Sequence, residues 1–350
     1  MRALQISTWH QEAKLVEIDE PIPEPGQVVV RIGAAGACHS DLHMMHGTGD
    51  TVPFSLPFTL GHENAGWVHS VGRGVTSVET GQPVAVYGAW GCGSCVRCSV
   101  GMENYCEAPN GPQVGAGGGL GLNGGMADYM LVPDARYLIP LPEGLTPVEA
   151  APLTDAGVTP YHAVRRSLQK LGPTSTALVI GVGGLGHLAI QILKATTSAR
   201  VIALDTKADA LDLALSLGAD SAFEAGDNAV QYVKAVTNKR GADLVLDCVG
   251  TDATLALGAA CTRSLGDFTL VGVAGGSMAF SFLSQAYEVS LQSVYWGSRS
   301  ELADVLELAA RGLIKPRINT YSLDRALDAY RDLAAGRVTG RAVIIPDRVS

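Results

Sequence analysis

The stretch Ala177-Leu178-Val179-Ile180-Gly181-Val182-Gly183-Gly184-Leu185-Gly186 decides the fold of the second half of the chain. Its four unbroken apolar residues predict a buried strand, and the apolar spacing from Leu185 onward predicts a helix. In a G-x-G-x-x-G turn between strand and helix, the glycines permit a tight turn, close approach of a phosphate and close packing. The stretch therefore predicts a dinucleotide site at the helix N-terminus. The alternative is a glycine turn that only packs a helix on a strand.

The next strand ends in a carboxylate that bears on the choice of dinucleotide. Asp205 follows the apolar run Val201-Ile202-Ala203-Leu204, 19 residues after Gly186. A carboxylate there can accept hydrogen bonds from both ribose hydroxyls and would repel a 2′-phosphate. We therefore expect NAD in preference to NADP, a preference that the nearby Lys207 can moderate.

The two halves of the chain differ in their pattern of apolar residues. After residue 154, strands that are apolar throughout alternate with helical segments, which predicts a parallel sheet covered on both faces, a doubly wound α/β domain. Before it, short apolar runs separated by glycine and proline predict a β-rich domain. The runs concerned are 15–18, 28–32, 67–71 and 84–87. The last segment is expected to contain helices at 301–311 and 323–334 and a strand at 342–345.

Composition limits the class of protein and its partners. The length of 350 residues favours two domains, and 47% hydrophobic and 17% charged residues describe a globular chain. The net charge of −9 argues against nucleic acid or an anionic membrane as a partner. We find no apolar leader and no run long enough to span a membrane. Seven cysteines, four of them clustered, indicate metal ligands in a reducing compartment, so we expect a cytoplasmic location.

That cluster has the spacing of a structural zinc site. Cys92-x-x-Cys95-x-x-Cys98 is followed after seven residues by Cys106, so four thiolates lie within fifteen residues. Four thiolates can enclose one zinc ion tetrahedrally and leave no open position. The alternatives are buried free cysteines or a redox pair, although a redox pair needs only two of the four.

A second motif carries a family resemblance. The segment Gly61-His62-Glu63-x-x-Gly66, followed by Gly72 and Val75, resembles the signature of the zinc-containing medium-chain alcohol dehydrogenases. The resemblance covers nearly the whole chain, including the cysteine cluster and the glycine turn. It implies a GroES-like catalytic domain at 1–154, a Rossmann NAD-binding domain at 155–296, and a return to the first domain at 297–350. It also implies a homodimer or homotetramer.

The resemblance implies a catalytic zinc ion held by Cys38, His62 and Asp155. Many relatives carry a second cysteine where this chain has Asp155. A thiolate, an imidazole and a carboxylate leave a fourth position open, as in catalytic zinc sites. Asp41 would orient His62 through its other ring nitrogen, and Glu63 would lie behind the metal. Taken singly, Cys38 could be a packing residue and Asp155 a helix cap.

The reaction implied is reversible hydride transfer between an alcohol carbon and C4 of the nicotinamide of NAD(H). Ser40 would accept the alcohol proton and His43 would pass it to solvent by way of the cofactor ribose. The alternatives are that Ser40 caps the helix that begins near Asp41 and that His43 is an exposed helix residue.

Further positions of the resemblance concern the cofactor and the substrate. The predicted cofactor-binding residues are His39, Thr159, Gly181, Gly183, Gly184, Leu185, Gly186, Asp205, Lys207, Val249, Gly250, Val271, Val273 and Arg341. The predicted substrate pocket comprises Phe54, Trp90, Tyr295 and Trp296, which could equally be ordinary core aromatics. Aromatic walls favour secondary alcohols, ketones and aryl aldehydes of medium to large size. The alternatives are a polyol dehydrogenase, a zinc-free quinone reductase, which the two zinc motifs disfavour, and a catalytically silent NAD-binding protein.

Overall fold

The computed structural model describes residues 1–46, 54–108 and 117–346. It divides into two compact units, each with its own sheet. Unit 1 contains residues 1–155, 298–310 and 316–350, and unit 2 contains residues 156–297 and 311–315. Within the described ranges, none of the helices is both long and apolar enough to cross a membrane.

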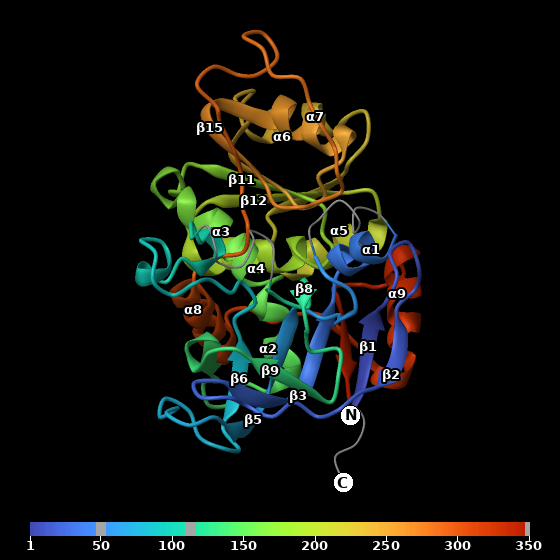
Figure 1. Ribbon diagram of the computed structural model, residues 1–350. Coiled ribbons are helices and arrows are strands. Elements are labelled where there is room, and N and C mark those ends of the chain that lie inside the picture. Colours follow the sequence, from blue (N-terminus) through green and yellow to red (C-terminus); the bar gives the residue numbers. More distant parts are fainter. Residues whose placement is uncertain (47–53, 109–116, 347–350) are drawn as a thin grey trace. The chain divides into compact units, whose positions relative to one another are not determined.

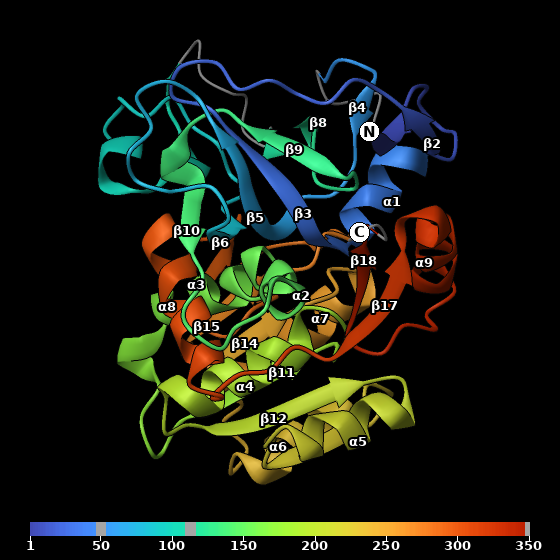
Figure 2. The same cartoon turned by 90° about the horizontal axis from the view of Figure 1, so that it is seen from below.

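Unit 1 is built on a seven-stranded sheet in the order β10-β6-β5-β3-β18-β17, with β9 also paired to β3 (Figures 1 and 2). The strands of this sheet are β3 (Val28–Ala37), β5 (Glu63–Val71), β6 (Pro83–Val86), β9 (Tyr129–Val132), β10 (Leu138–Pro140), β17 (Ile318–Ser322) and β18 (Arg341–Ile345). A three-stranded sheet consists of β1 (Arg2–Ile6), β2 (Lys14–Glu17) and β4 (Phe58–Thr59), and a two-stranded one of β7 (Gly117–Gly118) and β8 (Gly121–Leu122). The helices are α1 (His39–His46), α2 (Pro147–Ala150), α8 (Arg299–Ala310) and α9 (Ala326–Ala334), with 3₁₀ helices η2 (Cys98–Val100), η3 (Glu103–Tyr105), η4 (Ala135–Tyr137), η5 (Ala151–Thr154) and η7 (Leu323–Arg325).

The central strands β3 and β5 are longer than the apolar runs at 28–32 and 67–71 predict. β3 continues through glycines and alanines, β5 begins earlier at Glu63, and the pairing runs from Val28 opposite Val71 to Gly36 opposite Glu63. Gly66 permits this contact, because a Cβ atom there would lie 2.0 Å from the backbone oxygen of Arg31. Glycines and alanines weaken the alternation that marks a strand in sequence, so the extension was not predicted.

Unit 2 is a six-stranded sheet in the order β13-β12-β11-β14-β15-β16, and every neighbouring pair is parallel. Its strands are β11 (Thr176–Ile180), β12 (Arg200–Asp205), β13 (Ser221–Glu224), β14 (Ala242–Asp247), β15 (Thr262–Leu270) and β16 (Ser290–Ser293). Its helices are α3 (Val158–Arg166), α4 (Gly186–Thr196), α5 (Ala208–Ser216), α6 (Ala229–Val236) and α7 (Asp252–Cys261), with the 3₁₀ helix η6 (Leu168–Lys170).

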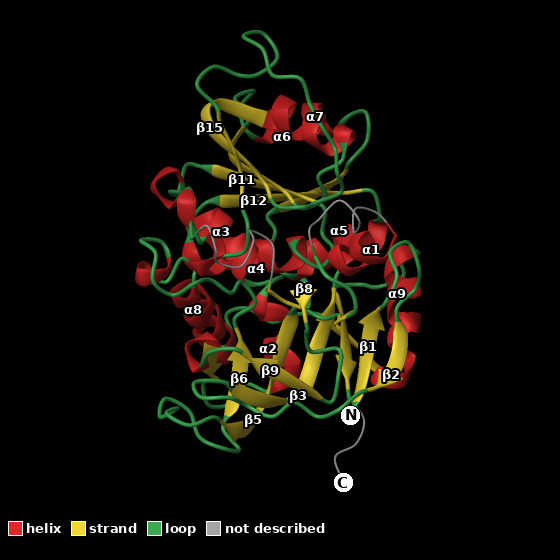
Figure 3. Cartoon of the chain, viewed as in Figure 1, coloured by secondary structure: helices red, strands yellow, loops and turns green. Residues whose placement is uncertain are grey.

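Helices cover both faces of this sheet, α3, α4 and α5 on one and α6 and α7 on the other (Figure 3). The central strands β11 and β14 are buried along their whole length, and each has an unbroken apolar run, 177–180 in β11 and 244–246 in β14. The strand order reverses between β11 and β14, and ligands of such sheets bind where the order reverses, outside the carboxyl ends of the strands. The predicted doubly wound parallel sheet is confirmed.

Candidate functional site

The structure brings the three predicted catalytic zinc ligands together within unit 1. Cys38 follows β3, His62 precedes β5 and Asp155 follows η5. The Cys38 Sγ atom, a ring nitrogen of His62 and a carboxylate oxygen of Asp155 all lie within 4.8 Å of one another. His62 Nε2 is 3.6 Å from Asp155 Oδ2. A thiolate, an imidazole and a carboxylate converging on one point form a donor set that fits zinc.

Asp41 ties two of these ligands to each other. It lies in the first turn of α1, is fully buried, and accepts a hydrogen bond of 2.9 Å from the backbone N–H of Cys38 to Oδ2. Its Oδ1 is 3.2 Å from His62 Nδ1. This contact fixes Nδ1 as the donor and leaves His62 Nε2 for a metal. The Oδ2 atom also accepts a hydrogen bond of 2.9 Å from the hydroxyl of Tyr330 in α9.

Closely packed glycines hold the backbone around His62. Gly61 has φ +94°, and a Cβ atom there would lie 2.6 Å from Met126 Cγ. Cβ atoms at Gly119 and Gly124 would come within 2.3 and 2.2 Å of the Gly61 backbone. Only glycine fits these three positions, so the glycine-rich segment after β7 packs directly on the chain that presents His62.

Glu63 and Arg341 form a buried ion pair beside the three ligands. Arg341 Nε donates to Glu63 Oε2 at 2.8 Å, and Arg341 Nη2 donates to Glu63 Oε1. The same Nη2 lies 3.9 Å from Asp155 Oδ2. Gly36 makes room for this pair, because a Cβ atom there would lie 1.8 Å from Glu63 Oε2. The Arg341 guanidinium therefore places a fixed positive charge next to the anionic donor set.

The electrostatics of the cluster favour the thiolate form of Cys38, which is the form that binds a metal ion. Burial raises the pKa of the Cys38 thiol, but Arg341 and His62 outweigh it and lower the pKa to about 7. Burial lowers the pKa of His62, and Asp41 and Asp155 overcome this effect, so the pKa lies well above its ordinary value. A bound cation would displace the ring proton, so metal binding here is linked to proton release.

The predicted relay residues belong to α1, next to the cluster. The Ser40 hydroxyl lies 3.6 Å from Cys38 Sγ. His43 is three residues further along, so both side chains project from the same side of the helix. His39 begins α1 and its side chain is exposed.

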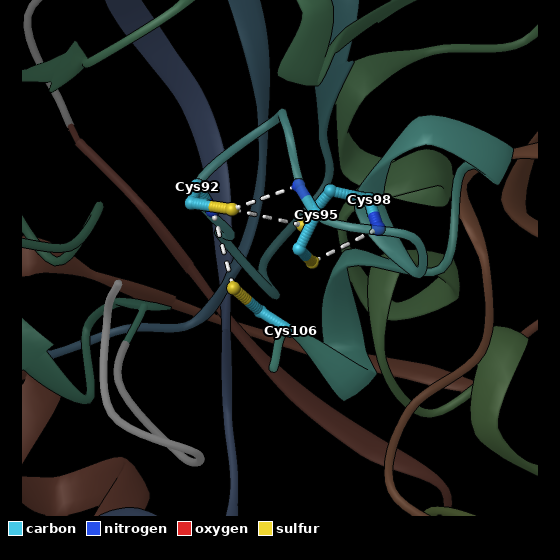
Figure 4. A group of neighbouring side chains, drawn as sticks. All are labelled: Cys92, Cys95, Cys98 and Cys106. Carbon is cyan, nitrogen blue, oxygen red and sulfur yellow. Dashed lines mark hydrogen bonds between the residues drawn. The ribbon is translucent and has the colours of Figure 1, made fainter. Parts of the chain in front are cut away.

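The four clustered cysteines also converge (Figure 4). One sulfur atom from each of Cys92, Cys95, Cys98 and Cys106 lies within 4.8 Å of the others. Backbone N–H groups point at the sulfurs, from Cys95 to Cys92 Sγ at 3.3 Å and from Cys98 to Cys95 Sγ at 3.5 Å. The N–H groups of Ser94 and Cys95 lower the pKa of Cys92 to about 6, whereas burial raises the pKa of Cys98 to about 12. Four thiols with some held as thiolates fit a closed zinc site.

Side chains from elsewhere in unit 1 anchor the cysteine segment. The hydroxyl of Tyr137 donates to the carbonyl of Gly91 at 2.6 Å and accepts from the N–H of Gly91 at 2.9 Å. Arg299 of α8 pairs with the buried Glu103 at 2.8 Å. These contacts join the segment to the rest of unit 1.

In unit 2 the glycine turn has the predicted form. Gly181 has φ +85°, and a Cβ atom there would lie 2.4 Å from Val249 Cγ2. A Cβ atom at Gly186 would lie 1.8 Å from the carbonyl oxygen of Gly181, so this glycine permits the close packing of α4 on β11. By contrast, no atom lies within 4 Å of a Cβ atom built on Gly183. The open space at the middle glycine is where a phosphate could approach the backbone.

The other predicted cofactor residues of unit 2 surround the carboxyl ends of its strands. Asp205 Oδ2 accepts a hydrogen bond of 2.7 Å from the N–H of Val182, and Oδ1 accepts one of 3.0 Å from the N–H of Lys207. Asp247 Oδ1 accepts from the N–H groups of Val249 and Gly250, both at 2.9 Å. Its carbonyl oxygen accepts from the N–H of Val271. Of the remaining residues, Thr159 is buried and Val273 is exposed.

The four predicted pocket aromatics belong to different units. Phe54 and Trp90 are in unit 1, where Phe54 packs edge-on against Phe58 and Trp90 stacks on Tyr137 at 5.9 Å. Trp90 is buried and donates to the carbonyl of Tyr87 at 2.9 Å. Tyr295 and Trp296 are in unit 2, with ring centroids 5.2 Å apart.

Sequence reasoning missed three residues that support these sites. Tyr330 donates a hydrogen bond to Asp41. Asp247 accepts hydrogen bonds from the backbone of two loops of unit 2. Arg299 anchors the cysteine segment. Asp247 carries a usable signal, because it ends a buried strand. Tyr330 carries none, because a tyrosine on an amphipathic helix is ordinary packing in sequence.

Comparisons with known proteins agree with this geometry. Residues 24–143 match the family model of the alcohol dehydrogenase GroES-like domain, and residues 184–311 match that of zinc-binding dehydrogenase. An NAD-dependent alcohol dehydrogenase of Sulfurisphaera tokodaii is 36% identical, over 99% of this chain and 100% of its own. A D-arabinose 1-dehydrogenase (NADP⁺) of Saccharolobus solfataricus is 36% identical, over 99% of this chain and 97% of its own. The crystal structure of the alcohol dehydrogenase from Aeropyrum pernix has a TM-score of 0.91 at 36% identity, covering 99% of this chain and 100% of that one. The chain belongs to the zinc-binding, NAD-dependent alcohol dehydrogenases of the medium-chain type, with a GroES-like domain and a Rossmann domain.

Proposed function

We propose that this chain catalyses reversible hydride transfer between secondary or primary alcohols and NAD⁺, with a zinc ion held by Cys38, His62 and Asp155. The observation that carries the proposal is the convergence of these three side chains within 4.8 Å of one another, next to a serine hydroxyl. When bound, zinc polarises the substrate oxygen and the nicotinamide carries the hydride.

The residues of α1 would handle the proton. Ser40 lies 3.6 Å from the Cys38 sulfur, so its hydroxyl is next to the position where a substrate oxygen would sit. A hydroxyl can accept the alcohol proton and donate its own. His43, one turn further on, would take that proton and release it to solvent by way of the cofactor ribose.

Two carboxylates would support the metal ligands. Asp41 orients His62 through Nδ1, as its 3.2 Å contact indicates. Glu63 lies behind the donor set and is held by Arg341, which limits its movement. The predicted contact of Arg341 with the cofactor pyrophosphate would use the guanidinium hydrogens that Glu63 does not engage.

The second zinc ion would be structural. Cys92, Cys95, Cys98 and Cys106 can fill all four tetrahedral positions, so no position remains for substrate. Its role would be to fix the segment from residue 92 to residue 106 on unit 1.

The cofactor would be NAD(H), bound on the glycine turn of unit 2. The residues proposed to contact it are those named in the sequence analysis, with Asp205 as the ribose ligand. In this structure Asp205 already accepts two backbone hydrogen bonds, which hold its carboxylate at the end of β12. A second negative charge, from a 2′-phosphate, would be repelled there.

For the substrate we propose apolar or aryl ketones and aldehydes of medium to large size. Phe54, Trp90, Tyr295 and Trp296 supply aromatic surface suited to such groups. The alternative is a polyol or sugar substrate, which the similarity to a D-arabinose 1-dehydrogenase supports. A sugar would need polar partners for its hydroxyl groups.

We also propose a homodimer or homotetramer that acts in the cytoplasm without nucleic acid or membrane partners. The proposal of a reducing compartment rests on the four clustered cysteines, which are arranged to bind a metal ion.

The test measures NADH oxidation with a panel of aryl ketones, aliphatic ketones and aldehydes, and NAD⁺ reduction with D-arabinose. Each assay is run with and without a zinc chelator, alongside metal analysis. We expect two zinc ions per chain and chelator-sensitive reduction of aryl or medium-chain ketones. Cys38→Ser should abolish turnover and lose one zinc ion, whereas Cys248→Ser, which changes a cysteine outside both clusters, should keep both.

Each outcome of this panel has a separate meaning. Oxidation of D-arabinose with no ketone reduction would replace the aryl substrate by a sugar. Two bound zinc ions with no turnover of any substrate would favour a silent NAD-binding protein. Full activity in Cys38→Ser would refute the catalytic zinc assignment.

A further inference from the structure

We propose that Tyr330 is a positioning residue for the catalytic zinc site, acting through Asp41 on both Cys38 and His62. This inference rests on the proposed function, because it assigns Tyr330 to the same metal. It adds to the predicted site a supporting residue from α9, almost 290 positions away from Asp41.

The hydrogen bonds at Asp41 form one connected network. Its Oδ2 atom accepts from the Cys38 N–H and from the Tyr330 hydroxyl, both at 2.9 Å, and its Oδ1 atom faces His62 Nδ1 at 3.2 Å. Asp41 is 0% exposed and Tyr330 is 2% exposed, so water does not compete for these bonds. Three protein donors therefore fix both oxygens of one carboxylate.

This arrangement makes the carboxylate orientation decisive for the metal. Rotation of the Asp41 carboxylate about its Cβ–Cγ bond would move Oδ1 away from His62 and Oδ2 away from the Cys38 backbone together. The Cys38 N–H belongs to the same turn as Asp41, so it holds the carboxylate only relative to its own helix. The Tyr330 hydroxyl comes from a different helix, α9, which packs against α1. Its hydrogen bond therefore holds the Asp41 carboxylate in place from outside α1.

The alternative to a positioning role is that the Tyr330 ring only packs in the interior between α1 and α9. The aromatic ring would then carry the whole effect, and removal of the hydroxyl would matter only for stability. Tyr330→Phe separates the two interpretations, because it keeps the ring and removes the donor.

The chain offers a matched control. The hydroxyl of Tyr321 in β17 donates to Asp332 Oδ2 at 2.8 Å, so it is also a tyrosine bound to a carboxylate in unit 1. Asp332 has no contact with Cys38, His62 or Asp155 among the interactions of the described residues. Tyr321→Phe therefore makes the same chemical change without touching the zinc ligands.

The experiment follows zinc release from the holoenzyme into a chromogenic chelator. The phase that belongs to the catalytic site is identified as the one missing in Cys38→Ser. In Tyr330→Phe we expect this phase to be about tenfold faster, since residues that orient metal ligands change metal affinity by about 10- to 100-fold. The phase of the four-cysteine site should be unchanged, and Tyr321→Phe should match the wild type in both phases.

Two further readouts separate positioning from stability. In cobalt-substituted enzyme, Tyr330→Phe should shift the visible d–d bands of the catalytic site. In the zinc enzyme, the fold-decrease in kcat should exceed the fold-change in KM. In an Asp41→Asn background, Tyr330→Phe should raise the rate of zinc release by less than twofold, because the carboxylate through which Tyr330 acts is already absent.

If the Cys38-dependent phase of zinc release in Tyr330→Phe has a rate within twofold of the wild-type rate, the inference is overturned. The proposed function would remain intact. An equal tenfold effect in the Asp41→Asn background would overturn the inference in the same way. A wild-type enzyme without any Cys38-dependent phase would instead overturn the proposed function, and the inference with it.

Discussion

Replacing Arg341 by methionine should destabilise unit 1 strongly, because it leaves a buried carboxylate without its partner. Glu63 is 0% exposed, Arg341 is 3% exposed, and two guanidinium nitrogens contact the two oxygens of Glu63. Breaking a buried pair from one side costs about 3–5 kcal/mol. At about 2–4 °C per kcal/mol for a unit of this size, the melting temperature should fall by roughly 6–20 °C.

The loss should depend on pH in a defined direction. Burial raises the pKa of Glu63, and Arg341 opposes that rise. Without Arg341 the folded-state pKa of Glu63 moves further above its unfolded value, so folded Arg341→Met binds a proton that the unfolded chain releases. In the wild type, burial already raises the pKa of Glu63 to about 8. The stability of Arg341→Met relative to the wild type should therefore change little below about pH 8, and should fall as pH rises further.

The assay is thermal and urea unfolding followed by tryptophan fluorescence, with zinc in excess, at pH 6 and pH 9. Arg2→Met is the control, because Arg2 pairs with Asp128 near the surface, at 12% and 23% exposure, where a pair contributes about 1 kcal/mol. Glu63→Gln combined with Arg341→Met should recover much of the loss, since no charge is left unpaired. The reasoning is refuted if Arg341→Met lowers the free energy of unfolding by no more than Arg2→Met does. It is also refuted if the double variant recovers none of the lost free energy.

Three further predictions concern other parts of the chain. Asp205→Ala should narrow the preference for NADH over NADPH by about tenfold, measured as the ratio of kcat/KM values; an unchanged ratio would exclude Asp205 as the ribose ligand. Cys38→Ser should abolish turnover while NADH still binds, measured by nucleotide fluorescence titration; retained turnover would count against the zinc assignment. Although burial raises the pKa of Asp128, Arg2 lowers it below its usual value, so this pair stabilises the fold above about pH 4 and loses the contribution as pH falls through the folded pKa. Asp128→Asn should therefore be less stable than the wild type at pH 7 by about 1 kcal/mol and equal to it near pH 2, and a difference that persists at pH 2 would contradict this account.

The sequence predicted the features that depend on local pattern. The glycine turn after Ile180 and the continuous apolar strands led to the parallel sheet, and the fold class and family are confirmed. The requirement for zinc and NAD also follows from the family, and the four clustered cysteines do lie together. The roles of individual residues, such as the relay through Ser40 and His43, remain predictions.

The contacts that the sequence could not predict join distant segments. Arg341 was expected to meet a pyrophosphate, and its pairing with Glu63 could not be seen because 278 positions separate them. The juxtaposition arises from register, since β18 pairs with β3, and β3 in turn sets Gly36 opposite Glu63. Periodicity assigns residues to a face of a strand but does not say which strand lies alongside.

The separation of these contacts along the chain has a consequence for biosynthesis. All four cysteines of the structural site emerge from the ribosome within one stretch of fifteen residues, so this site can bind its metal while translation continues. The other site depends on Tyr330 and Arg341, which follow the cysteine segment in the chain by more than 200 residues. The environment of its ligands is incomplete until α9 and β18 have been made. The two zinc ions should therefore load in a fixed order, the structural one first and the catalytic one only after β18 has paired with β3.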